Sequence, residues 1–161
     1  MVLTEGIDFS TVGSDLTSMS TANGSYLFRY LPNCTGITLD GCTQITSLFN
    51  GVNQMDFSYM THLQKLSIQN CTGLTEDIDL TNNLEIEEVD ASDTTINVFV
   101  PDGSALTKYE LGTPTSVRLV DQARLNYASI NVDSSENIDS VYIVNVPNSR
   151  SFNAFGKIMN L

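Results

Sequence analysis

The sequence predicts a mainly β fold, a short solenoid with about 21 residues per coil and two parallel sheets. Three observations predict it: one series of apolar residues, a second series interleaved with the first at about half a period, and short polar turns between them. In the first series the central apolar residues are Ile68, Ala91, Leu111 and Val132. In the second series they are Phe57, Leu80, Val100, Leu119 and Ile143.

The first series is clearest from Leu63 to Leu74, where the apolar positions fit L-x-x-L-x-L-x-x-C-x-x-L. Because side chains i and i+2 of a strand point to the same side, these apolar residues should face a core and the residues between them should face solvent. The expected outward residues of the first series are Ser67, Asp90, Glu110 and Asn131. Those of the second series are Asp56, Asp79, Phe99, Arg118 and Tyr142. Phe99 is the exception among them because its side chain is not polar.

The segments between the strands are short and contain turn-forming residues, as in Pro101-Asp102-Gly103 and Gly112-Thr113-Pro114. Gly tolerates positive φ and Pro fixes φ, so both favour turns. These linkers are too short for a helix. Each coil is therefore expected to hold two strands and no helix, and several coils must stack before any of them can bury its apolar face.

The two ends of the chain depart from the repeat. Residues 1–25 are rich in Ser, Thr and Gly and are expected to form an irregular N-terminal cap or tail, followed by about five coils over residues 26–147. Within residues 148–161, the spacing of Phe152, Phe155, Ile158 and Met159 predicts a capping helix that starts after Asn148 or Ser149. We also expect that the natural chain continues beyond Leu161.

Residues 31–147 resemble the degenerate leucine-rich-repeat regions of proteins from gut Bacteroidales and their tailed, crAss-like phages. The segments that carry the resemblance are Gly41-Cys42-Thr43, the stretch 63–74, Val89-Asp-Ala-Ser92 and Val100-Pro-Asp-Gly103. The resemblance implies a leucine-rich-repeat-like solenoid that acts as a binding or structural part of a large virion or cell-surface protein. It supplies no catalytic residues to carry over.

Composition disfavours several classes of partner. Lys and Arg number 7 against 19 Asp and Glu, a formal net charge of −12, so phosphate backbones and anionic membrane surfaces should be repelled. The sequence contains no apolar run of the roughly 20 residues that a membrane span needs. We therefore expect neither nucleic-acid binding nor membrane insertion.

Residues with catalytic or ligand-binding chemistry are few. The three cysteines Cys34, Cys42 and Cys71 do not have zinc-ribbon spacing and are expected to be free and buried. His62 is the sole histidine and is expected to be structural or merely exposed. Acidic residues cluster at Asp77 and Asp79, at Glu85, Glu87, Glu88 and Asp90, and at Glu136 and Asp139. A solvated face, a calcium-type cation site and a glycosidase pair remain alternatives for them.

These observations favour a non-enzymatic protein-interaction or structural module without a cofactor or a metal. Its expected partner is a protein, either a virion neighbour or a host-surface protein, so the module should be located in a phage virion or on a bacterial surface. The expected interaction face consists of Asp56, Asp79, Phe99, Arg118 and Tyr142. A carbohydrate-binding or carbohydrate-processing domain that uses acidic surface residues is the alternative, with a glycan as its partner.

Overall fold

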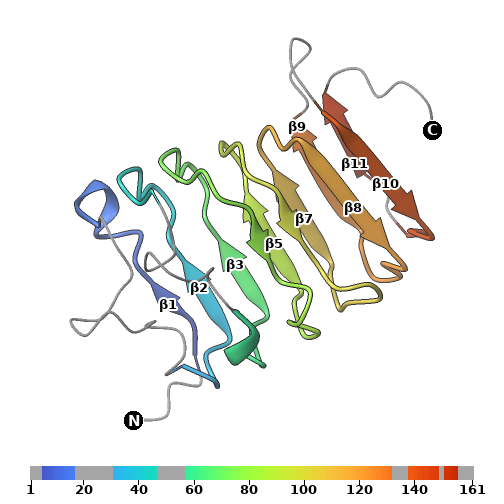
Figure 1. The fold of residues 1–161 in the computed structure, drawn as a ribbon. Helices are drawn as coiled ribbons and strands as arrows, with labels where there is room; N and C mark the ends of the chain where they lie inside the picture. The colour runs from blue at the N-terminus through green and yellow to red at the C-terminus, as the bar shows by residue number, and fades with distance from the viewer. Residues whose placement is uncertain (1–4, 17–30, 47–56, 132–137, 149–150, 156–161) are drawn as a thin grey trace.

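The computed structural model describes residues 5–16, 31–46, 57–131, 138–148 and 151–155, and these form a β-solenoid of stacked parallel strands (Figure 1). Seven strands make the main sheet, in spatial order β1-β2-β3-β5-β7-β9-β11. Their bounds are β1 Ile7–Asp8, β2 Gly36–Thr38, β3 Lys65–Ser67, β5 Glu88–Ala91, β7 Lys108–Leu111, β9 Tyr127–Asn131 and β11 Ser151–Phe155.

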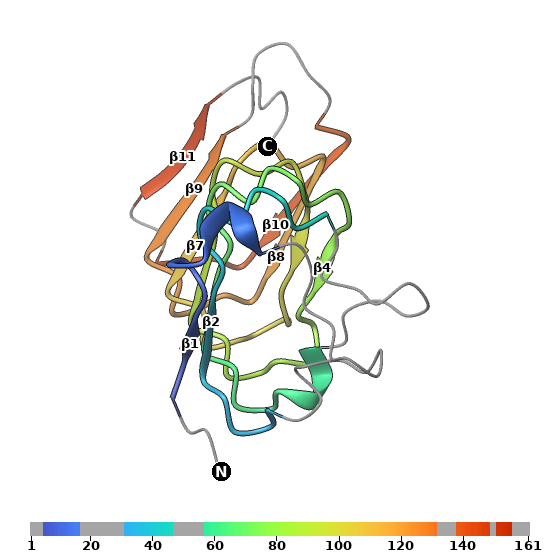
Figure 2. The ribbon, with the colours of Figure 1, turned by 90° about the vertical axis from the view of Figure 1, so that its left-hand side faces the viewer.

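The opposite side of the coils, here called the second face, holds two parallel strand pairs. They are β4 Ile78–Asp79 with β6 Val98–Phe99, and β8 Ser116–Val120 with β10 Ser140–Val144. The view along the solenoid shows the main sheet on one side and β4, β8 and β10 on the other (Figure 2). The helical elements of the described residues are two short 3-10 segments, η1 Gly13–Asp15 and η3 Phe57–Tyr59. The expected mainly β solenoid with parallel sheets is therefore confirmed. Phe57 was predicted at the centre of a second-series strand and instead begins η3, so the second face has strands only from β4 onward in the described residues.

The paired main-sheet strands from β2 to β11 have a mean spacing of about 23 residues per turn, slightly longer than the predicted period, because the pairing of Gly36 with Lys65 spans a longer coil. Lys65 pairs with Glu88, Glu88 with Lys108, and Lys108 with Tyr127. The fourth copy of the first series was predicted two residues too late, because Leu111 pairs with Ile130 and not with Val132. Apolar residues two apart fit a strand equally well, so alternation alone could not choose between them.

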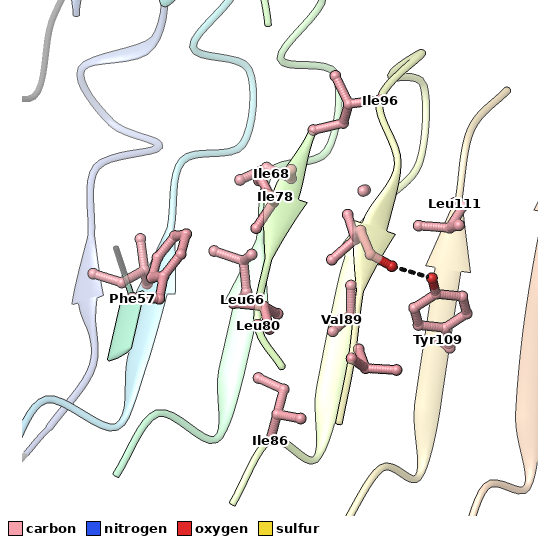
Figure 3. Packing of buried hydrophobic residues seen from close by; sticks show 14 of the residues in the cluster. Phe57, Leu66, Ile68, Ile78, Leu80, Ile86, Val89, Ile96, Tyr109 and Leu111 are labelled. Atoms are coloured by element: carbon pink, nitrogen blue, oxygen red, sulfur yellow. Dashed lines mark hydrogen bonds between the residues drawn. The ribbon is translucent and has the colours of Figure 1, made fainter. Parts of the chain in front are cut away.

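The core lies between the main sheet and the second face. In the main sheet Leu66, Val89, Tyr109 and Ala128 lie in register on adjacent strands, and each is fully buried. Residues of the second face, such as Ile78 and Leu80, pack against this column from the other side (Figure 3). Like positions of successive coils therefore stack into one continuous apolar core.

Buried amide side chains tie neighbouring coils together at the turns that follow the second face. Asn83 Nδ2 donates to the carbonyl oxygens of Phe57 and Met60, each at 2.9 Å. Gln122 Nε2 donates to the carbonyl oxygen of Pro101 at 2.7 Å. Both side chains are fully buried, so these bonds satisfy turn carbonyls that water cannot reach.

Three of the turns that follow main-sheet strands contain a left-handed residue, whereas the turn after β7 at Gly112 and Thr113 does not. Gly41, Asn70 and Asp93 occupy this place in successive coils, with φ values of 76°, 57° and 58°. Gly, Asn and Asp are the residues that adopt this conformation most readily. Their presence at these three turns explains why small and polar linkers helped to predict the coils.

Both ends of the chain differ from the prediction. The helix predicted within residues 148–161 is wrong for residues 151–155, which form strand β11 and pair with β9 over five residues. The i, i+3 spacing of Phe152 and Phe155 fits a helix locally, but β9 offers a row of backbone partners that only the stacked coils create. Residues 156–161 lie outside the described residues. Near the N-terminus, Ile7–Asp8 extends the main sheet by pairing with β2, so an irregular cap over 1–25 is wrong for this segment.

Candidate interaction face

The second face places four of the five residues of the predicted interaction face on its strands, in two register pairs. Asp79 on β4 pairs with Phe99 on β6, and Arg118 on β8 pairs with Tyr142 on β10. Strand β6 also lies against β8, so the four residues form one outward row across the coils. Asp56 lies outside the described residues. We call Asp79, Phe99, Arg118 and Tyr142 the outward row.

Arg118 is held in one orientation by two neighbours. Its guanidinium makes two hydrogen bonds to the Asp102 carboxylate, one of them from Nη2 to Oδ2 at 2.9 Å. Its Cζ also lies 6.0 Å from the centre of the Tyr142 ring, within cation–π range. The hydrogen bond from Arg118 lowers the pKa of Asp102, and the same bond raises the pKa of Arg118. Both side chains are almost half exposed, and their ion pair favours the charged form of each.

Apolar surface continues next to this ion pair. Tyr142 is 56% exposed and Val144 is 42% exposed, and both belong to β10. Val144 pairs with the half-buried Val120 on β8, and Phe99 is half-buried as well. The outward row thus combines two aromatic rings, a fixed arginine and an aliphatic strip on a rigid sheet.

The acidic residues considered for catalysis have structural tasks. Asp77 Oδ1 accepts a hydrogen bond from the backbone N–H of Asn97 at 2.9 Å, and its Oδ2 accepts one from Asn97 Nδ2 at 3.0 Å. Asp79 Oδ1 accepts from the backbone N–H and the hydroxyl of Thr81, at 2.8 and 2.6 Å. Each carboxylate therefore orders the chain around it.

Acidic residues in β5 and just before it contact histidine or lysine side chains of neighbouring coils. His62 Nδ1 lies 3.2 Å from Glu85, and Lys65 Nζ lies 3.5 Å from Glu88. In the same way, Lys108 Nζ lies 3.3 Å from Asp90. Because equivalent residues stack in register, Glu85, Glu88 and Asp90 lie next to histidine or lysine side chains of the coils on either side. Glu136 lies outside the described residues.

Asp90, Lys108 and Glu110 form a partly buried charged group on the outer surface of the main sheet. Lys108 Nζ also contacts Glu110 at 2.8 Å, and the two carboxylates belong to residues paired across β5 and β7. Burial of Asp90 opposes its ionisation. Hydrogen bonding with Glu110 and from Ser92, together with the Lys108 charge, outweighs burial and lowers the pKa of Asp90.

This group makes a pH-dependent contribution to stability. The folded-state pKa of Asp90 is lowered, so its contribution is present above the unfolded value near 4 and is lost as the pH falls through the folded value. We expect Lys108→Met to lower the free energy of unfolding by about 1 kcal/mol at pH 7, because two facing carboxylates lose their cation. At pH 3, below the unfolded pKa of Asp90, the difference should shrink, because part of the contribution of Asp90 is then lost. Urea unfolding at both pH values measures it.

Lys65→Met is the matched control. Its ion pair with Glu88 is longer and more exposed, so the expected change is below about 0.5 kcal/mol at either pH. A Lys108→Met effect that is equally large at pH 7 and pH 3 would contradict the assignment.

The three cysteines are free and buried, as predicted. Cys71 Sγ donates to the carbonyl oxygen of Leu39 at 3.0 Å, and Cys42 Sγ lies 3.8 Å from the carbonyl oxygen of Phe9. Burial raises the pKa of Cys71 to about 11 and also raises that of Cys42. These thiols stay protonated at neutral pH, which suits packing and not nucleophilic chemistry.

Within the described residues, no three His, Cys, Asp or Glu side chains are grouped so that they could hold a metal ion. The part of the chain that the structure describes also contains no helix long and apolar enough to cross a membrane. His62 is about half exposed and its Nδ1 lies 3.2 Å from the Glu85 carboxylate, which agrees with the expected surface position.

The fold and the outward row define a β-solenoid with a rigid, partly aromatic outer face. No protein-family model, no curated protein and no solved structure matches the chain.

Sequence reasoning missed three members of this surface: Asp102, Val120 and Val144. Asp102 was interpreted only as part of a turn, and its contact with Arg118 depends on how that turn lies against β8. Val120 and Val144 were missed because they lie one residue beyond the inward positions Leu119 and Ile143. Their strict alternation with these core residues was the signal that could have found them.

Proposed function

We propose that this chain is a non-enzymatic protein-interaction or structural repeat module whose contact surface is the outward row. The observation that carries the proposal is the arrangement around Tyr142: an exposed ring, an arginine fixed by Asp102, and the adjacent Val144. Tyr and Arg are the residues most enriched at the centres of interfaces. Arg118 is already ordered, so a partner would lose little side-chain entropy on binding it.

The regular backbone supports the same proposal. The residues of the outward row lie on parallel strands, and paired strands are about 4.8 Å apart. A partner that presents an extended or flat surface meets one side chain per coil. The formal net charge of −12 favours a partner surface with basic residues around an apolar centre.

The proposal extends to where the module acts. We propose a phage virion, as part of the tail or another structural protein, or otherwise a bacterial surface protein. This extension rests on the sequence resemblance alone. Mass spectrometry of purified virions and of surface fractions from the source tests it, and recovery of the chain only from the remaining soluble fraction would contradict it.

The contact surface is tested by paired variants. A partner is captured from virion or surface extracts with the whole chain, purified, and its Kd is measured by calorimetry. We expect Arg118→Ala with Tyr142→Ala to raise the Kd at least about tenfold, as truncation of central interface residues does. The control, Lys65→Ala with Tyr127→Ala, changes a cation and an aromatic residue on the outer side of the main sheet and should leave the Kd within about twofold.

Thermal unfolding of both double variants establishes that they fold. An unchanged Kd in the outward-row variant, or a larger loss in the main-sheet variant, would overturn the assignment of the contact surface.

A further inference from the structure

A cleft of about 690 Å³ lies where the turns after β5 and β7 meet the end of β9. The β5 turn contributes Asp93 and Thr95, the β7 turn contributes Gly112 and Thr113, and β9 contributes Ser129 and Asn131. The cleft is separate from the outward row, whose residues do not line it. Its volume lies within the range of sites that bind small molecules, roughly 300–1,000 Å³.

The walls of the cleft are held by backbone contacts. Gly112 N–H donates to the carbonyl oxygen of Ala91 at 3.0 Å, and Thr113 N–H donates to that of Thr94 at 2.8 Å. A Cβ at Gly112 would lie 2.1 Å from the Thr94 carbonyl oxygen, so the two turns touch as closely as glycine permits. On the third side, β9 is paired with β7 and β11. The cleft is thus preformed, which lowers the entropic cost of binding.

The polar side chains around the cleft are available to a ligand. The side chains of Asp93, Thr95, Thr113, Ser129 and Asn131 make no hydrogen bond or ion pair with any described residue. By contrast, Ser92 and Thr94 beside them already donate their hydroxyl hydrogens, to Asp90 and to the Ala91 carbonyl oxygen. The rigid wall therefore presents three hydroxyls, one amide and one carboxylate that are not committed elsewhere.

We propose that this cleft binds a neutral saccharide, either a single sugar or one unit of a neutral glycan. Each sugar hydroxyl both donates and accepts, as do the threonine and serine hydroxyls and the asparagine amide of the cleft. The Asp93 carboxylate can accept from two neighbouring sugar hydroxyls. No Lys or Arg of the described residues lines the cleft, and the chain carries a formal net charge of −12, so a phosphate or an acidic sugar is disfavoured.

The proposal is tested on the whole chain by two-dimensional NMR with assigned backbone amides. The probes are glucose, galactose, mannose and N-acetylglucosamine, with glucuronate as the anionic comparison. We expect saturable shifts centred on Asp93, Thr113 and Ser129, with a Kd of about 1 mM for at least one neutral sugar and weaker binding of glucuronate.

Two variants and one control locate the site. Asp93→Asn keeps a residue that tolerates the left-handed turn and should weaken binding about tenfold, and Ser129→Tyr should block the cleft. Tyr142→Ala on the second face should leave sugar binding unchanged. This control also separates the cleft from the proposed protein-contact surface, so that either proposal can fail alone.

Three results would overturn the proposal. The first is that no neutral sugar, added to about 20 mM, causes saturable chemical-shift changes. At that concentration a site with a Kd of about 1 mM would be almost fully occupied. Another is binding that neither Asp93→Asn nor Ser129→Tyr alters. The last is tighter binding in the cleft of glucuronate, or of a short Ser- and Thr-rich peptide, than of any neutral sugar.

Discussion

Replacing Leu111 with aspartate is expected to unfold the protein. Leu111 is 2% exposed and lies in register between Ala91 and Ile130 in the inward column of the main sheet. A carboxylate at this position would be buried without a cation, which costs several kcal/mol, whereas whole domains are stable by only about 5–15 kcal/mol. Loss of the far-UV circular dichroism signal and of the cooperative urea transition measures the effect.

Two controls separate burial of charge from disturbance of the strand. Leu111→Met keeps an apolar side chain of similar volume and should cost less than about 1.5 kcal/mol. Glu110→Ala changes the adjacent, outward residue and should cost about 1 kcal/mol or less, because it loses the ion pair with Lys108. If Leu111→Asp is no less stable than Glu110→Ala, the assignment of inward and outward residues is wrong.

Replacing Tyr109 with alanine should have the next largest effect. Tyr109 is fully buried, and its hydroxyl donates to the carbonyl oxygen of Val98 at 2.5 Å (Figure 3). This bond crosses the core, because Tyr109 belongs to β7 of the main sheet and Val98 to β6 of the second face. Tyr109→Ala removes both the ring and the bond, so we expect a loss of about 3–5 kcal/mol in urea unfolding.

Tyr109→Phe isolates the hydrogen bond. It keeps the ring and leaves the Val98 carbonyl oxygen without this donor, so the expected loss is about 1–3 kcal/mol. A Phe variant as stable as the natural protein would show that the bond across the core adds nothing.

The same residue gives an independent readout at alkaline pH. Burial raises the pKa of Tyr109, so the stability that depends on its neutral form is present below the unfolded value near 10 and is lost as the pH rises toward the folded value. In a spectrophotometric titration, one tyrosine of the natural protein should ionise only when the chain unfolds. That delayed step should be missing in Tyr109→Phe.

Much of the coil could be predicted because its causes are local. Alternation of apolar and polar residues placed Asp90 and Glu110 on the outer side of the main sheet, and the structure confirms this. Ser67 was predicted to face solvent and is instead buried, because its hydroxyl donates to Asp40 of the preceding coil. Left-handed turns need Gly, Asn or Asp, and these residues stand at the required places. The outward row could be predicted in the same way, since it required only the side of the strand to which each side chain points.

Errors arose wherever the answer depended on stacking. Ile130 and Val132 are equivalent by alternation, and only the pairing of β9 with β7 selects Ile130 as the partner of Leu111. The apolar residues within 151–155 have a helix-like spacing, yet this segment forms a strand because its backbone pairs with the edge of β9. Each choice was made by hydrogen bonds between residues about one coil apart, which local patterns do not encode.

The sequence by itself determined the two-series repeat, the inward and outward alternation and the turn chemistry, because each depends on neighbouring residues along one coil. The tertiary structure alone decided the register, the pairing of Arg118 with Asp102 and Tyr142, the group around Lys108, and the cleft beside Gly112. The physical reason is that coil lengths vary while strands must still pair in register. Which side chains meet across coils is therefore fixed only when the coils stack.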